Sequence, residues 1–185
     1  MKKMLAKKFL LCLIIGMVCC SLATKAQKYY GQWVVGGHGS FYRGFGGGIE
    51  VEKYLGKSLS FLRLRLSYSH FENKSQKWKL PTNSIIGDFA YFYSLEKYMP
   101  KSFIVNLGGG FLLGQEKYKN KNLPSGVIQA STNKIITGIV FHPQAEFNLG
   151  KISTYIEPSV GYLFNTAFSH FHVKISVGIK YYFSI

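Results

Sequence analysis

The chain has 185 residues, of which 47% are hydrophobic, and it carries a net charge of +15 at pH 7. All three cysteines lie within the first 20 residues, which excludes a disulfide framework, a cysteine nucleophile and a thiolate metal site from the rest of the chain. The length predicts one domain, and the basic balance is compatible with nucleic acid, with anionic lipid or with a solvated basic surface.

The first 26 residues have the pattern of a secretory signal peptide. Four early lysines precede the apolar run "FLLCLIIGMV", and small and polar residues ending in "TKAQ" follow it. The run is too short for a transmembrane anchor, which needs about 20 apolar residues. A lipoprotein leader cut before Cys19 or Cys20 is the other interpretation, although "GMV" and "MVC" match such a site poorly. We therefore predict residues 1–26 as a cleaved leader and residues 27–185 as the mature domain.

Beyond the leader, apolar and polar residues alternate with period two, and no segment predicts a long amphipathic helix. Eight strands are predicted in chain order, at residues 30–41, 45–54, 62–69, 85–94, 103–114, 135–144, 152–162 and 170–183. The last strand has the clearest pattern, because every odd-numbered residue from Phe171 to Phe183 is apolar. Such lengths fit the roughly 9–11 residues of a transmembrane β-strand, and an even number of strands suits a closed barrel.

The predicted connections differ between the two ends of the strands. At one end, "YLGKSL" and "NLGKIS" predict tight Gly–Lys turns and "EKYMPKS" is short. At the other end, "NKSQKWKLPTN" and "EKYKNKNLPSGVIQASTNK" predict longer polar loops, although the first and last connections at this end are short. This partial asymmetry is typical of outer-membrane barrels. Lysines in the longer loops could contact lipopolysaccharide phosphates or DNA, but we interpret them as a solvated surface and predict no direct binding of nucleic acid. These lysines are Lys74, Lys77, Lys79, Lys117, Lys119, Lys121 and Lys134.

Alternation alone does not separate a soluble sandwich or lipocalin from a membrane barrel, because the two differ in which face meets water. Three features favour the membrane: strands longer than the usual 5–6 residues, a polar face rich in Gly, Ser and Asn that a narrow barrel requires, and aromatic residues near the strand ends. We therefore predict an all-β fold, an eight-stranded antiparallel up-and-down transmembrane β-barrel. The aromatic residues assigned to the two interfaces are Tyr29, Tyr30, Trp33, Tyr91, Phe92, Tyr93, Tyr98, Tyr162, Phe164, Tyr181, Tyr182 and Phe183.

Charged residues flank the first predicted tight turn. Glu50 and Glu52 precede the Gly56–Lys57 turn, and Arg63 and Arg65 follow it. Pairing across a two-residue turn puts even-numbered glutamates on the same face as odd-numbered arginines. We predict that these four residues form structural ion pairs in a dry lumen, because a lone buried charge would be costly. Further charges predicted for this plugged interior are Asp88, Glu146, Glu157, Lys174 and Lys180.

The sequence contains the ingredients of a serine hydrolase but no motif that assembles them. They are His70, His142, His170, His172, Ser69, Ser169, Glu146 and Asp88, without a nucleophile elbow or another triad motif. "HFH" places two imidazoles on one strand face, but two ligands are weak evidence for a metal, and we interpret both as rim histidines. "GGHGSFYRGFGGG" lacks the Lys-Ser/Thr of a phosphate loop and suits close packing of the first hairpin. No catalytic residue, cofactor or metal is predicted.

The tail "SHFHVKISVGIKYYF", the middle stretch "VNLGGGFLLGQEKY" and the leader end "KAQ" resemble the TraO family of conjugative-transposon transfer proteins. The resemblance implies a non-enzymatic outer-membrane component of the mating apparatus, with a role in conjugal transfer of DNA. Its partners would be outer-membrane lipid and other proteins of the apparatus. Two alternatives remain open: a general small barrel for adhesion or envelope integrity, and a barrel enzyme that modifies lipid A.

Overall fold

The computed structural model describes residues 31–41, 44–55, 60–75, 78–99, 102–118, 133–166 and 170–183, with the backbone alone for residues 72–75, 78–81 and 118. The strands are β1 (Trp33–Phe41), β2 (Gly44–Leu55), β3 (Ser60–Ser75), β4 (Trp78–Ser94), β5 (Phe103–Tyr118), β6 (Asn133–Asn148), β7 (Ile152–Leu163) and β8 (Phe171–Tyr182). A three-residue 3-10 helix, η1 (Glu96–Tyr98), lies between β4 and β5. No helix among the described residues is long and apolar enough to cross a bilayer.

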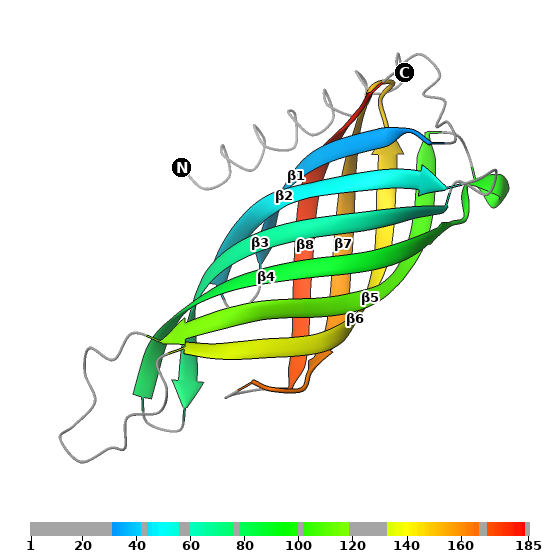
Figure 1. Cartoon of the computed structure of the whole chain (residues 1–185). Coiled ribbons are helices and arrows are strands. Elements are labelled where there is room, and N and C mark those ends of the chain that lie inside the picture. The colour runs from blue at the N-terminus through cyan, green and yellow to red at the C-terminus, as the bar shows by residue number, and fades with distance from the viewer. Residues whose placement is uncertain are drawn as a thin grey trace, which may run out of the picture.

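The strands follow one another around the sheet in chain order, and β8 pairs back with β1 (Figure 1). Every neighbouring pair is antiparallel, so the sheet is a closed up-and-down barrel and the predicted fold is confirmed. The predicted leader, residues 1–26, lies outside the described residues and stays a prediction.

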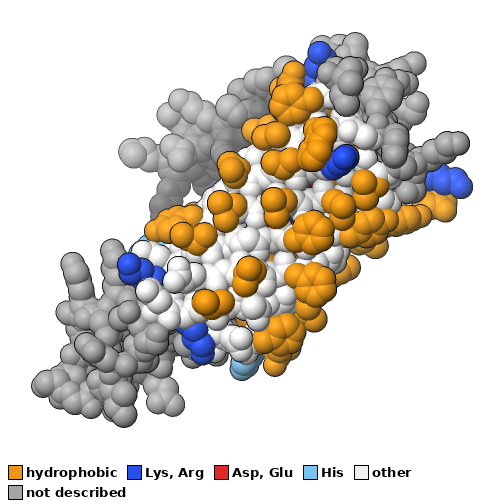
Figure 2. Space-filling view, viewed as in Figure 1, with side chains coloured by type: hydrophobic (Ala, Val, Ile, Leu, Met, Phe, Trp, Pro, Cys, Tyr) orange, Lys and Arg blue, Asp and Glu red, His pale blue; other side chains and the backbone are white. Residues whose placement is uncertain are grey.

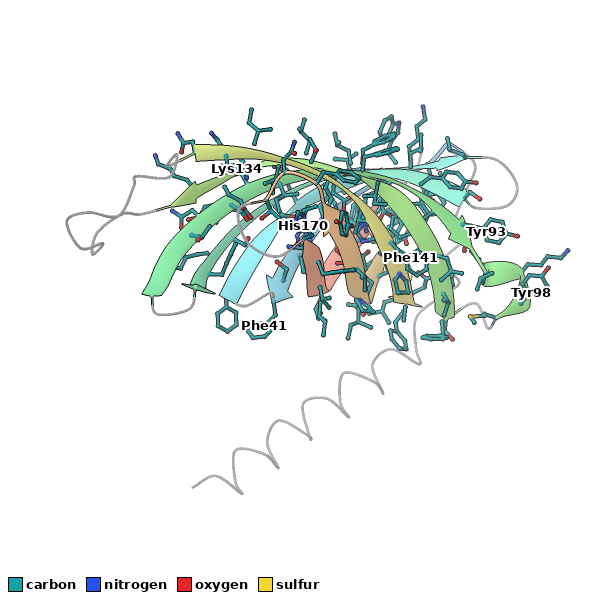
Figure 3. All side chains as sticks on the ribbon, turned by 90° about the horizontal axis from the view of Figure 1, so that it is seen from below. Phe41, Tyr93, Tyr98, Lys134, Phe141 and His170 are labelled. Carbon is teal, nitrogen blue, oxygen red and sulfur yellow. The ribbon has the colours of Figure 1, made fainter. Side chains whose placement is uncertain are left out.

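The apolar stripe of each strand faces outward. In β8 the exposed fraction of the outward side chains runs from 44% at Tyr181 to 64% at Phe171, whereas Ser176 and Lys180 on the other stripe are fully buried. Hydrophobic side chains cover the visible face of the barrel (Figure 2), and Phe41 and Tyr93 point away from it (Figure 3). A water-soluble barrel would show the opposite arrangement. The outer surface therefore has the chemistry of the lipid-facing band of an outer-membrane barrel.

The lumen is narrow enough to require glycine. A Cβ atom at Gly108 would lie 2.5 Å from the ring of Phe92, and one at Gly178 would lie 2.5 Å from the ring of Tyr155. Both distances are far below van der Waals contact, so these rings fit only because the opposing residue has no side chain. Gly39, by contrast, faces outward, and a Cβ atom there would meet nothing within 4 Å.

We expect Gly178→Ala to displace the Tyr155 ring and to lower the free energy of unfolding by about 1–3 kcal/mol, the usual range for overpacking. The measurement is urea unfolding of the folded protein in detergent micelles. Gly39→Ala is the matched control and should leave the unfolding midpoint close to that of the wild type, because its methyl group meets open space. Equal losses in the two variants would contradict a close-packed lumen.

Two apolar clusters close the interior, one near each end. The first lies where β1 begins and β8 ends, and Phe61 and Phe92 stack within it with their ring centroids 4.7 Å apart. Its members are Val34, Tyr54, Phe61, Ala90, Phe92 and Tyr182. The second, toward the opposite end, comprises Ile86, Leu112, Ile136, Val140 and Leu163. The polar interior lies between these two clusters.

The assignment of Phe92 and Tyr182 to the interfacial aromatics was wrong. Both are buried in the lumen, because they belong to the inward stripe of their strands, whereas Tyr91, Tyr93 and Tyr181 belong to the outward stripe and are exposed. The side chains that share a stripe are set by period two, so nearness to a strand end is not enough to place an aromatic ring at the surface.

The long polar loop predicted at residues 73–83 is mostly strand. β3 continues to Ser75 and β4 begins at Trp78, and the two remain paired through Asn73 with Leu80 and Ser75 with Trp78. Backbone N–H and C=O groups pair whatever the polarity of their side chains, so a polar composition did not end these strands. Residues 119–132 of the other long loop lie outside the described part of the chain.

The turn between β6 and β7 is tight, as predicted. The Leu149 N–H donates to the Ile152 carbonyl at 2.8 Å, so Gly150 and Lys151 form a two-residue loop. Gly150 has φ of 86°, in the left-handed region that glycine adopts without steric cost. The corresponding Gly56–Lys57 turn is not among the described residues.

Candidate functional site

Between the two apolar clusters lies a buried set of charged and polar side chains, here called the lumen network. Its members are Glu50, Glu52, Arg63, Arg65, Asp88, His142, Gln144, Glu146, Tyr155, Glu157 and Lys180, and none is more than 2% exposed. Five of the eight acidic residues of the chain belong to it. The inward stripes of six strands supply these residues, so the network links β2, β3, β4, β6, β7 and β8.

Arg65 on β3 pairs with carboxylates of two other strands, β2 and β7. Its Nε and Nη2 atoms donate to Glu50 Oε2 at 2.9 and 2.7 Å, and its Nη1 donates to Glu157 Oε1 at 2.7 Å. The Nη2 atom also donates to the Tyr155 hydroxyl at 3.2 Å. Since the fork of the guanidinium is fully used, Arg65 fixes the relative positions of β2, β3 and β7.

Arg63, two residues earlier on β3, also has two carboxylate partners. Its Nη2 donates to Asp88 Oδ2 at 3.2 Å, and its Nη1 pairs with Glu157. The His142 imidazole lies between the same two carboxylates, with Nε2 3.1 Å from Asp88 Oδ2 and Nδ1 3.0 Å from Glu157 Oε1. Glu157 is thus shared by both arginines and by the histidine, which makes it the central carboxylate of the network.

Lys180 on β8 organises the part of the network nearer the chain termini. Its Nζ lies 2.9 Å from Glu52 Oε1 and 3.5 Å from Glu146 Oε2, and it donates to Gln144 Oε1 at 3.1 Å. The Tyr182 hydroxyl donates to Glu146 as well. One lysine therefore lies beside two buried carboxylates and offsets part of their charge.

The structure places all four residues predicted as lumen ion pairs in the interior of the barrel. The sequence did not specify which carboxylate would pair with which cation. The register places Glu50 opposite Arg65 and Glu52 opposite Arg63. Only the first of these cross-strand pairs is an ion pair; the cation beside Glu52 is Lys180. The structural role of these pairs stays a prediction.

Among the described residues, the catalytic ingredients noted in the sequence are not assembled. Ser69 Oγ lies 2.7 Å from Ser84 Oγ, and His70 Nδ1 lies 2.6 Å from Asn83 Oδ1. Ser169 lies outside the described residues. His142 has a carboxylate oxygen about 3 Å from each ring nitrogen, and neither of these neighbours is a serine.

One histidine–serine contact was missed by the sequence analysis. His38 Nε2 lies 3.1 Å from Ser67 Oγ, across β1 and β3. The other ring nitrogen, Nδ1, is buried and has no hydrogen-bond partner in the described part of the chain. No described carboxylate orients this imidazole through a hydrogen bond, so the pair lacks the third member of a triad.

The two histidines of "HFH" have different surroundings. His170 is exposed and its Nδ1 lies 2.7 Å from the Leu163 carbonyl, whereas His172 is buried. Among the residues the structure describes, no group of three His, Cys, Asp or Glu side chains could hold a metal ion. The ion pairs of the network connect side chains that come from different strands of the barrel.

Comparison with known proteins identifies a family and a fold. The family model described as "Conjugative transposon protein TraO" matches residues 38–183. No curated protein matches the sequence.

Solved structures similar to this chain are outer-membrane barrels. A major outer membrane protein from Thermus thermophilus has a TM-score of 0.59 at 12% identity, with 82% of this chain and 99% of that chain covered. The N-terminal β-barrel domain of Pseudomonas aeruginosa OprF has a TM-score of 0.55 at 11% identity, with 84% and 100% covered. Neisserial surface protein A has a TM-score of 0.52 at 15% identity, with 85% and 100% covered. At these identities the likeness shows the fold.

Proposed function

This chain belongs to the conjugative transposon protein TraO family, and from that premise we propose that it is a non-enzymatic outer-membrane component of an apparatus for conjugal DNA transfer. The observation that carries the proposal is the family match, which spans residues 38–183 and so reaches from the first strand to the end of the last. The barrel fold and the outward apolar stripes support a place in the outer membrane, with lipid as the immediate partner.

The interior supports a structural rather than a catalytic role. In the lumen network, carboxylates lie beside both arginines, Lys180 and His142, and an apolar cluster lies on each side of the network. A barrel filled in this way would act through its outer surface and its loops, where other proteins of the apparatus can bind. We propose no direct contact with nucleic acid and no cofactor.

The test is an in-frame deletion in a donor strain, with mating frequency as the measurement. We expect transfer to fall by at least about a hundredfold and to return when the wild-type gene is supplied in trans. Membrane fractionation of the complemented strain should place the protein with the outer membrane. Recovery of the processed chain as a soluble periplasmic monomer would contradict the membrane assignment.

Two outcomes would favour the alternatives. Unchanged mating frequency together with greater sensitivity to detergent would indicate a general barrel for adhesion or envelope integrity. A change in the mass spectrum of lipid A between the deletion and the complemented strain would indicate a lipid-modifying enzyme. The first result would remove the conjugation role, and the second would remove the non-enzymatic one.

A further inference from the structure

The ladder between β6 and β7 is interrupted at its middle. The two strands are paired from Gly138 with Leu163 to Phe141 with Val160, and again from Ala145 with Ile156 to Asn148 with Ser153. Residues 142–144 and 157–159 are not paired across this ladder. The same residues remain paired on their other sides, β6 with β5 and β7 with β8. The interruption therefore belongs to one ladder of the wall and not to either strand.

Two prolines face each other in the gap. The register that pairs Phe141 with Val160 and Ala145 with Ile156 places Pro143 directly opposite Pro158. Proline has no backbone N–H, so neither residue can donate to the other strand. Prolines within sheets are normally confined to edges and bulges, and this barrel is closed.

The two prolines occupy a position of the ladder where two backbone hydrogen bonds would otherwise form. In this ladder the Leu149 N–H donates to the Ile152 carbonyl, and the Phe164 N–H donates to the Thr137 carbonyl. Bonded pairs recur at every second residue of an antiparallel ladder, so counting by twos from Leu149 places Pro143 and Pro158 at a bonded pair. Both backbone hydrogen bonds of that pair are therefore absent from the β6–β7 ladder.

Lumen side chains bridge the gap from inside. Gln144 Nε2 on β6 donates to Glu157 Oε2 on β7 at 2.9 Å, and His142 Nδ1 on β6 lies 3.0 Å from Glu157 Oε1. Glu157 is held in turn by Arg63 and Arg65 of β3. The residues that flank the prolines thus direct their side chains inward and tie the strands together where the backbone does not.

We infer that the barrel wall opens laterally between β6 and β7, and that Glu157 is the clamp that keeps this seam closed. The backbone ladder resists separation of neighbouring strands, and here it is replaced by contacts of a single carboxylate. Pro143 and Pro158 lie on the outward stripe, so an opening at this height joins the polar lumen to the surrounding lipid. This inference rests on the barrel itself and does not depend on the role in conjugation.

The test is amide hydrogen exchange of the processed full-length protein in micelles, followed residue by residue by NMR. The informative amides are Phe141, Ala145, Ile156 and Val160, which flank the gap. In the wild type we expect them to exchange about tenfold or more faster than amides at the middle of the β3–β4 ladder, because opening at the seam exposes them first. Exchange as slow as in β3–β4 would overturn the inference.

Two sets of variants separate the clamp from the prolines. Glu157→Gln should accelerate exchange at the seam by about a further tenfold. Its matched control is Glu52→Gln, since Glu52 pairs with Lys180 on β8 and not with a cation of β6 or β7. Equal acceleration of every ladder by both variants would show that Glu157 has no special role at the seam.

The double substitution Pro143→Val with Pro158→Val restores both N–H groups at outward positions, where a branched apolar side chain suits the lipid face. It should slow exchange at the seam to the rate of the β3–β4 ladder, and it keeps the proposal testable if the Glu157 variant does not fold. Unchanged seam exchange in the double variant would show that the prolines are not the cause and would overturn the inference.

Discussion

Arg65→Leu is expected to lower the free energy of unfolding by about 3–5 kcal/mol, the largest single loss that the structure predicts. The substitution keeps an apolar side chain in the space but removes the cation that Glu50 and Glu157 share. Both carboxylates are buried in a medium that solvates charge poorly, and Glu50 would lose its paired arginine while Glu157 would keep only Arg63 of its two arginines. Urea unfolding in micelles measures the loss, and reduced yield of folded barrel in the outer membrane is the expected consequence in cells.

Two further variants test whether the loss in Arg65→Leu comes from its ion pairs. Lys97→Leu removes an exposed lysine from η1 and should leave the unfolding midpoint nearly unchanged, since an exposed charge contributes little. The double variant Arg65→Leu with Glu50→Leu should lose less than the sum of the two single variants, because it removes both members of one pair. Strict additivity, or a loss below about 1 kcal/mol for Arg65→Leu, would contradict a structural role for the predicted ion pairs.

Ile139→Arg is expected to destabilise the barrel in the membrane by about 2–4 kcal/mol. Ile139 lies on the outward stripe near the middle of β6, so the guanidinium would enter the apolar band away from the end of the strand at Asn148. The free energy of folding into lipid vesicles, followed by urea titration, measures the effect. A soluble barrel with a hydrated outer face would tolerate the same substitution, so the result also tests the membrane assignment.

Phe147→Arg is the matched control for depth. Phe147 lies on the same stripe of the same strand, and its side chain is 48% exposed, as is that of Ile139. It differs in lying one residue from the end of β6, where the cost of an arginine falls to about 0–1 kcal/mol because the side chain reaches the interface. Equal losses at the two positions would show that depth does not matter and that the outer face does not meet lipid.

The fold was predictable because period two alone decides which side chains share a face. The odd-numbered residues of β8 were assigned to one apolar stripe from the sequence, and the structure exposes them. Strand ends were less predictable. Polar residues around Asn73 and Leu80 suggested a loop, yet their backbone continues the ladder, since pairing depends on the neighbouring strand and not on side-chain polarity.

The members of the lumen network were also largely predictable, but their contacts were not. The parity across one turn placed Glu52 and Arg63 on the inner stripe. Glu52 lies on β2 and Lys180 lies on β8, with β1 between these two strands. The cation beside Glu52 therefore depended on how the strands are staggered when the barrel closes. The gap between Pro143 and Pro158 had a signal in the sequence that was not used: both prolines are equally far from the Gly150–Lys151 turn.

The strands differ in length, so the barrel wall is taller on one side than on the other. β3 to β6 have 16 or 17 residues, whereas β1, β2, β7 and β8 have 9 to 12 (Figure 1). At about 3.3 Å per residue and a tilt of about 40°, a strand of the longer group rises roughly 40 Å, against an apolar band of about 25 Å. The extra length of β3 to β6 lies at the end of the barrel opposite the chain termini. There the backbones of these strands remain paired beyond the apolar band. The described strands therefore extend farther beyond the apolar band at β3 to β6 than at β1, β2, β7 and β8.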